Sequence, residues 1–98
     1  MAPASARRLE WSKTARRQLA EQIEYVALRG LADPNTVIDR VDRAAALIEH
    51  NPGIGTPGRK AGTREWPIKN SPLTMIYRVV KRKIHIIAVV HQRQNALG

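Results

Sequence analysis

Residues 73–91, LTMIYRVVKRKIHIIAVVH, decide the fold of this 98-residue chain. Two apolar runs, Leu73–Val80 and Lys83–His91, are rich in β-branched residues and flank the short basic turn Lys81-Arg82. Runs of this length and composition, joined by a short polar break, are typical of two antiparallel strands. The second run is almost continuously apolar over Ile84–Val90, which predicts a central strand covered on both faces.

A third strand is expected just before this pair. Thr63–Lys69 is rich in strand-forming residues, and Asn70-Ser-Pro72 supplies a turn after it. Pro67 has no backbone N–H to donate to a neighbouring strand, so its strand is expected at an edge or a bulge. Residues 63–91 therefore predict a three-stranded antiparallel meander.

Two amphipathic helices are expected ahead of the meander. Ser12 is a suitable N-cap for the first helix, whose apolar residues recur at helical spacing until Gly30 closes it. The second helix is expected to begin at Asp33-Pro34, a cap followed by proline at the first helical position, and to end at Asn51-Pro52. Residues 51–62, NPGIGTPGRKAG, are rich in glycine and proline and predict a loop.

The whole chain, residues 1–98, is expected to form one α+β domain, since its length leaves room for a single hydrophobic core. Arg8–Trp11 alternates charged and apolar residues and predicts a short N-terminal strand before the helical hairpin. The two helices are expected to pack on one face of the sheet. Residues 1–6 and 95–98 are expected to be loose.

Composition excludes several classes of protein. The chain has no cysteine, which excludes disulfides and thiolate chemistry and is usual in the reducing cytoplasm. It shows neither a signal peptide nor an apolar stretch approaching the ~20 residues of a membrane span, so no membrane association is expected. His85 and His91 are expected on one side of the last strand but roughly 20 Å apart, too far to share a metal. No metal or cofactor is expected.

Positive charge is concentrated in the C-terminal part of the chain. The formal net charge is +9, and residues 1–58 contribute +1 of it while residues 59–98 contribute +8. A strongly basic surface favours a polyanion or an acidic protein as partner. The functional surface is therefore expected on the sheet half, although lysine and arginine on an ordinary solvated surface would also serve solubility.

Motifs in this order are similar to the RelE/ParE toxin superfamily of bacterial type II toxin–antitoxin systems, over about residues 8–95. The pieces that carry the resemblance are Asn51-Pro-Gly-Ile-Gly55, Thr63-Arg-Glu-Trp66, Leu73-Thr-Met-Ile-Tyr77-Arg-Val79, and Ile84 to Val89-Val90-His91-Gln-Arg93. The Asn-Pro helix end, the Tyr-Arg-Val strand and the Val-Val-His-x-Arg strand end look most like the ParE branch.

The ParE-like resemblance implies a cytoplasmic toxin that arrests growth by inhibiting DNA gyrase, acting by binding rather than by catalysis. It also implies a cognate ParD-like antitoxin that neutralises the toxin in a hetero-oligomer. The residues we expect to contact gyrase or its bound DNA are basic or histidine residues of the sheet half: Arg59, Lys60, Arg78, His91 and Arg93. The plain alternative is that the basic residues only form the solvated rim of the sheet and that His91 is a hydrogen-bonded histidine at a strand end.

The RelE-like branch is an alternative and implies a ribosome-dependent endoribonuclease that cuts mRNA. Such cleavage needs proton transfer and cations over the phosphate, and Lys69, His91 and Arg93 fall where that branch carries such groups. Against it, the chain has no tyrosine beyond the last strand, Thr74 occupies a position where the branch has arginine, and the preceding lysine-rich stretch is reduced to Arg59-Lys60.

A non-toxic basic module that binds nucleic acid is a second alternative. Its lysines and arginines would hold phosphates, but the interleaved aromatic residues of a base-stacking platform are missing, since the chain has no phenylalanine and two tyrosines in different elements. Steep salt dependence of nucleic-acid binding without growth arrest would favour this alternative.

Overall fold

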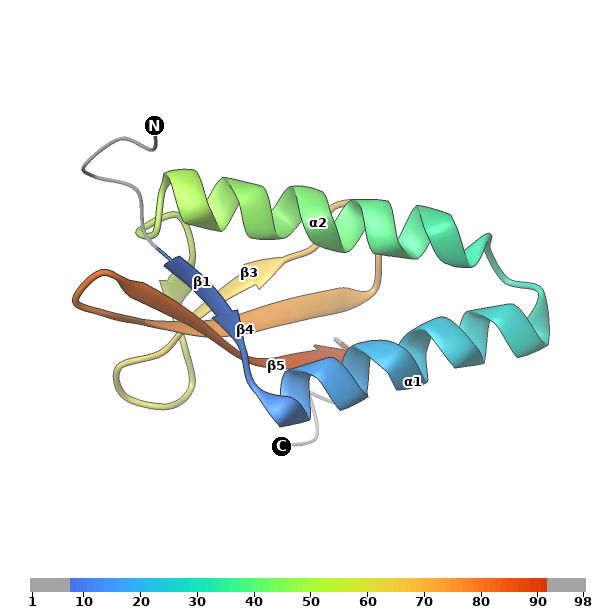
Figure 1. The fold of residues 1–98 in the computed structure, drawn as a ribbon, viewed down its shortest axis with the longest axis horizontal. Coiled ribbons are helices and arrows are strands. Elements are labelled where there is room, and N and C mark those ends of the chain that lie inside the picture. The colour runs from blue at the N-terminus through green and yellow to red at the C-terminus, as the bar shows by residue number, and fades with distance from the viewer. Residues whose placement is uncertain (1–7, 92–98) are drawn as a thin grey trace.

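The computed structural model describes residues 8–91, and the expectation that residues 1–6 and 95–98 are loose lies outside them. The elements, in chain order, are β1 (Arg8–Trp11), α1 (Lys13–Arg29), α2 (Pro34–His50), β2 (Thr56–Pro57), β3 (Arg64–Pro67), β4 (Leu73–Val80) and β5 (Lys83–His91). The strands form one sheet in the order β1-β5-β4-β3-β2, and both helices pack on one side of it (Figure 1). The predicted α+β class, helical hairpin and β3-β4-β5 meander are confirmed.

The sheet has two strands more than the predicted meander. β1 lies parallel to β5, with Leu9 opposite Ile84, so β5 is central as predicted. β2 lies within residues 51–62, where a loop was expected, and pairs Thr56 with Glu65 on the outer edge of β3. Two residues, one of them proline, are too few to show the alternation of apolar and polar residues that predicts a strand. Thr56 and Pro57 form a strand because they pair with β3.

Both helices begin and end at the predicted capping residues. The Ser12 hydroxyl accepts a hydrogen bond from Ala15 N at 3.0 Å, and Gly30 closes α1 in the left-handed conformation with φ 62°. Asp33 caps α2 by accepting from Asn35 N at 2.9 Å, with proline in the first turn. Neither helix of the described chain is long and apolar enough to cross a membrane.

The core lies between the helices and one face of the sheet. The buried hydrophobic residues are Ala15, Val37, Val41, Ala44, Ala45, Ile48, Ile68, Leu73, Met75, Tyr77, Ile84, Ile86 and Val89. The α2 members recur at three- and four-residue spacing, and the strand members alternate along β4 and at the start of β5. The second face of β5 is only half-buried, so the prediction that this strand is covered on both faces was wrong.

Tyr77 ties the loop after α2 to the centre of the sheet. Its ring is completely buried, and its hydroxyl donates to Pro52 O at 2.6 Å and accepts from Gly55 N at 2.9 Å. Burial raises the pKa of Tyr77 above its ordinary value near 10, which keeps the hydroxyl protonated as the donor that Pro52 needs. The loop therefore has one fixed path into β3.

A β-bulge in β5 changes which side chains face the helices. Ile76 pairs with Ala88 and Tyr77 with Ile86, so Ile87 is an extra residue between them. Residues at the start of α1 hold this bulge: the Ser12 hydroxyl donates to Ile87 O at 2.9 Å, and Gln18 accepts from Val89 N at 2.8 Å.

The bulge places His85 and His91 on opposite faces, which corrects the prediction that they share one. His85 pairs with Arg78 on the face away from the helices, and His91 pairs with the buried Leu73 on the helical face. A side-chain period of two holds only in an uninterrupted strand, so the extra residue reverses every later position.

Candidate functional site

The sheet face away from the helices, called here the open face, carries a band of charged residues across three strands. Glu10 of β1 lies between two basic groups of β5, with Lys83 Nζ at 3.5 Å from Oε1 and His85 Nδ1 at 3.9 Å from Oε2. Arg78 of β4 pairs across the sheet with His85. Because neighbouring strands lie about 4.8 Å apart, these groups form one continuous surface.

Three of the five residues predicted to bind the target come together at this face. Arg59, Lys60 and Arg78 line one hollow of ≈ 230 Å³. The other lining residues are Thr63, Ile76, Ile87 and Ala88. All three cations are exposed, and the floor between them is apolar and half-buried. The arrangement suits a partner with an anionic surface and a small apolar area that would pack on the floor of the hollow.

The β2–β3 loop that carries Arg59 and Lys60 is held by its own hydrogen bonds. Gly58 N donates to Thr63 O at 2.8 Å, and the Thr63 hydroxyl donates to Lys60 O at 2.6 Å. Gly62 has a φ of 80°, a conformation that favours glycine, and a side chain at Gly58 would collide with the Thr63 hydroxyl. The loop therefore presents its cations in one conformation.

Glu65 is bound tightly by one of these cations. Arg59 Nε and Nη2 donate to its two carboxylate oxygens at 2.9 and 3.1 Å, and Arg59 N adds a third hydrogen bond at 3.1 Å. These hydrogen bonds lower the pKa of Glu65. Neither Lys60 nor Arg78 forms an ion pair with another described residue, so these two cations carry the remaining charge of the hollow.

The Arg59–Glu65 pair predicts a loss of stability in acid. Because the folded-state pKa of Glu65 lies below its ordinary value of 4.5, the pair stabilises the fold above that value, and the contribution is lost as the pH falls through the lowered pKa. Urea unfolding between about pH 6 and pH 2 is expected to show a smaller decline in stability for Glu65→Gln than for the unmodified chain. Identical declines in both proteins would contradict a role for this pair.

The two described residues of the ribonuclease alternative, Lys69 and His91, line different hollows, although Arg40 lines both. His91 lines a hollow of ≈ 330 Å³ on the helical face together with Tyr25, Val26 and Leu73. Lys69 lines a different hollow beside α2, and Thr74 is buried. Arg93 lies outside the described residues. His91 also lies apart from Arg59, Lys60 and Arg78, so the structure divides the predicted target-binding set.

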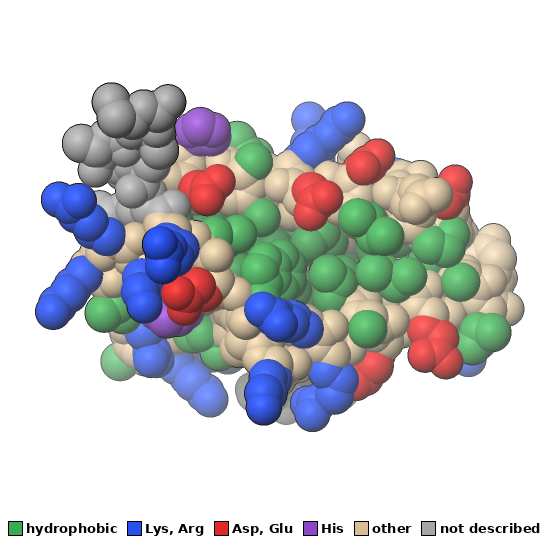
Figure 2. Space-filling model, viewed as in Figure 1, with side chains coloured by type: hydrophobic (Ala, Val, Ile, Leu, Met, Phe, Trp, Pro, Cys, Tyr) green, Lys and Arg blue, Asp and Glu red, His purple; other side chains and the backbone are tan. Residues whose placement is uncertain are grey.

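The helical face is mainly apolar, and the residues that it exposes, Tyr25, Leu28 and Leu31, were not named as site residues from the sequence. Figure 2 shows a band of hydrophobic side chains running between α1 and α2, with charged residues along both sides. Tyr25, Leu28 and Leu31 are 48%, 78% and 61% exposed, and Tyr25 and Leu31 line the ≈ 330 Å³ hollow near His91. The sequence did carry a signal for this surface, because apolar residues near the end of the first helix do not fall among those that form the core.

A family model and a curated relative both match nearly the whole chain. The family model described as the ParE toxin of type II toxin–antitoxin system, parDE, matches residues 9–96. The chain is 30% identical over 91 residues to the Y4kP protein of Sinorhizobium fredii (strain NBRC 101917 / NGR234), covering 93% of this chain and 94% of Y4kP.

Solved structures of toxin–antitoxin proteins share the fold. A chain of the chromosomal ParDE system from P. aeruginosa superposes with a TM-score of 0.70 at 19% identity, over 90% of this chain and 98% of that one. A chain of the RelBE2 toxin–antitoxin complex from Mycobacterium tuberculosis gives a TM-score of 0.62 at 21% identity, over 88% and 98%. Since the family model spans nearly the whole sequence, this protein belongs to the ParE toxin family of type II toxin–antitoxin systems.

Proposed function

We propose that this toxin inhibits DNA gyrase by binding, and that the hollow of Arg59, Lys60 and Arg78 on the open face makes the toxic contact. The observation that carries the proposal is this grouping of three exposed cations over an apolar floor in a member of the ParE family. Cations of this kind attract an acidic protein surface or DNA and speed the encounter. Arg93 and the chain after it remain part of the proposed contact surface.

Binding is favoured over mRNA cleavage by the positions of the candidate catalytic groups. A general acid or base must come within hydrogen-bond reach of the group it serves, and a phosphate-stabilising cation must lie beside it. Lys69 and His91 line different hollows, whose linings have Arg40 in common. We also propose that the protein acts in the cytoplasm, where gyrase is.

Two parallel assays on one preparation test the proposal. Purified toxin is titrated into a gyrase supercoiling reaction and into a ribosome-programmed mRNA cleavage reaction. Loss of supercoiling with intact mRNA is the expected result. Cleaved mRNA with normal supercoiling would replace the proposal with the RelE-like activity and give Lys69, His91 and Arg93 catalytic roles. Binding to nucleic acid with neither effect would favour the non-toxic module.

An antitoxin is proposed as the second partner, binding the helical face. The P. aeruginosa ParDE and M. tuberculosis RelBE2 structures are of toxin–antitoxin systems. Here Tyr25, Leu28 and Leu31 leave apolar surface exposed beside the hollow between the helices. An amphipathic, acidic segment of a ParD-like antitoxin that lies across the helical hairpin and the sheet would bury this surface and meet the positive charge of the sheet half.

Antitoxin binding is expected to raise the melting temperature of the toxin substantially. A ligand at 100 times its dissociation constant stabilises the folded state by about 2.7 kcal/mol, which is on the order of 10–20 °C for a domain of this size. Leu31→Asp is expected to reduce this gain, because it puts a charge on the apolar surface that the antitoxin would bury. Scanning calorimetry with the cognate antitoxin measures both, and a free toxin that gains nothing on binding would contradict the proposed docking face.

A further inference from the structure

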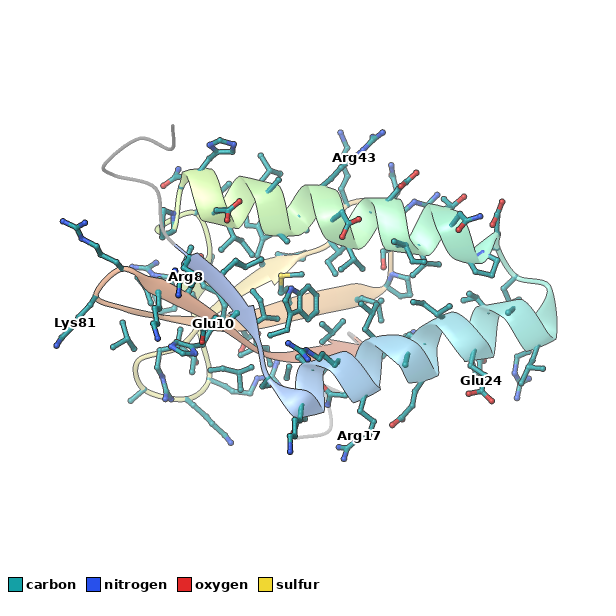
Figure 3. All side chains as sticks on the ribbon, in the orientation of Figure 1. Arg8, Glu10, Arg17, Glu24, Arg43 and Lys81 are labelled. Atoms are coloured by element: carbon teal, nitrogen blue, oxygen red, sulfur yellow. The ribbon has the colours of Figure 1, made fainter. Side chains whose placement is uncertain are left out.

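A basic hollow on the outer side of α2 takes no part in the proposed function. It has a volume of ≈ 270 Å³ and is formed by α2, β3 and the turn after β3. Its lining residues are Arg40, Arg43, Ala44, Leu47, Trp66, Lys69 and Asn70. We call it the α2–β3 hollow. Arg43 projects from α2 on the side away from α1 (Figure 3). Arg40 is the one lining residue that also lines the ≈ 330 Å³ hollow near His91.

Three cations line this small volume, and the lining contains no acidic residue. Arg40 is half-buried and is held in place by a hydrogen bond from Nη1 to Asn70 O at 2.7 Å. Arg43 and Lys69 are exposed, and neither forms an ion pair with a described residue. Like charges gathered without a counterion repel one another, so an anion bound here would relieve that repulsion.

The floor of the hollow is apolar and includes an aromatic ring. Ala44 is buried, Leu47 is 49% exposed, and Trp66 is half-buried against the core. Trp66 stands opposite the buried Met75 in the sheet, which fixes its ring on the helical side of β3. An indole at the edge of a basic site offers a surface on which a planar ring can stack.

We propose that the α2–β3 hollow binds the phosphate of a nucleotide, with the base packed on Trp66. A phosphate monoester carries a charge of about −1.5 to −2 and three acceptor oxygens, and so matches three converging cations. A single carboxylate neutralises one charge and has two oxygens, which fits this group less well. The proposal goes beyond the proposed function, since it involves neither gyrase nor antitoxin. The same phosphate chemistry is supplied by a free nucleotide or by the 5′ end of a nucleic acid.

Tryptophan fluorescence of the full-length protein tests the proposal directly. The chain has two tryptophans, and Trp11→Phe leaves Trp66 as the only one. We would titrate this variant with AMP, ATP, inorganic phosphate, an eight-nucleotide DNA with and without a 5′-phosphate, and an acidic peptide of alternating glutamate and leucine. Calorimetric titration of the unmodified chain gives the same affinities without depending on the Trp11 substitution.

AMP, ATP or the 5′-phosphorylated DNA is expected to quench Trp66, and inorganic phosphate to bind more weakly because it lacks a base. Arg43→Ala and Lys69→Ala are each expected to weaken binding about tenfold, the effect of one charge-assisted hydrogen bond. Arg17→Ala, on the opposite side of the helical layer (Figure 3), is expected to leave the affinity within about twofold.

The nucleotide arms separate the two sources of the phosphate. Binding of AMP or ATP identifies a free nucleotide, whereas binding of only the 5′-phosphorylated DNA identifies a nucleic-acid end. Absence of binding by all phosphate ligands would overturn the proposal. The proposal would also be overturned if Arg43→Ala and Arg17→Ala lowered the affinity equally, or if the acidic peptide bound more tightly than any phosphate ligand.

Discussion

Replacing Arg78 by glutamate is expected to raise the toxin concentration needed for half-inhibition of gyrase supercoiling by about 100-fold. Arg78 lines the open-face hollow together with Lys60 and the apolar floor, and reversal of its charge turns an attraction into a repulsion within the contact. Losing one partner of an interfacial charge pair costs about 2–5 kcal/mol, and about 2.8 kcal/mol corresponds to 100-fold. A supercoiling assay over a range of toxin concentrations measures the change.

Arg17→Glu is the matched control for this prediction. It makes the same change of charge on α1, at an exposed residue whose ion pair within residues 8–91 is with Glu21 on the same helix, and exposed pairs of this type contribute little. Both variants are expected to unfold within about 0.5 kcal/mol of the unmodified chain, as exposed substitutions usually do. Equal inhibition by Arg78→Glu and Arg17→Glu would remove the open face from the mechanism, and combining Arg78→Glu with Arg93→Glu would extend the same test to the strand end.

Gly55→Ala is expected to be the most destabilising single change in the loop after α2. A Cβ at this position would lie 2.7 Å from the Tyr77 hydroxyl oxygen and 3.0 Å from Glu65 O. Tyr77 is fully buried, so it cannot move without breaking its hydrogen bonds to Pro52 and Gly55. Overpacking costs about 1–3 kcal/mol and a buried hydrogen bond about 1–3 kcal/mol more, so a loss of about 3 kcal/mol is expected.

Gly53→Ala, two residues away, provides the control. The nearest atom to a Cβ there is Asn51 Oδ1 at 3.8 Å, which is an ordinary contact, and the expected change is within about 0.5 kcal/mol. Thermal unfolding of the two variants is expected to differ by at least about 10 °C, given 4–8 °C per kcal/mol for a domain of this length. Melting temperatures within a few degrees of each other would show that the loop adapts and that Tyr77 does not fix its path.

Local signals in the sequence account for most of the secondary structure. Ser12, Gly30 and Asp33 are capping residues whose chemistry acts within one helical turn, and the structure uses all three as predicted. The boundaries of β4 and β5 also match the prediction, because glycine-free apolar runs ended by polar turns carry their own limits.

Features that depend on distant contacts could not be predicted in the same way. The parallel pairing of β1 with β5 joins residues more than 70 positions apart. The bulge at Ile87 is stabilised by Ser12 and Gln18 of the helical part. Apolar residues stand on both sides of Ile87 in the sequence, so either orientation of His91 is compatible with the pattern.

The candidate site was predicted only in part, because its make-up also depends on contacts between distant parts of the chain. Arg59, Lys60 and Arg78 come together because the antiparallel meander brings the β2–β3 loop beside β4. His91 was grouped with them from its position near the strand end, but the bulge turns it to the helical face. Glu65, the partner of Arg59, had a signal in the sequence, since it is the only acidic residue between positions 59 and 98.

The measurement that tests the central claim most directly is the accumulation of double-strand breaks in plasmid DNA incubated with gyrase, ATP and increasing amounts of the purified toxin, stopped with detergent and protease. The proposal predicts that the amount of linear DNA rises with the concentration of toxin. At a given concentration, the Arg78→Glu variant is expected to give less linear DNA than the unmodified toxin, and the Arg17→Glu variant the same amount. Relaxed plasmid that gyrase still supercoils completely, without linear DNA, at toxin concentrations well above that of gyrase would contradict it.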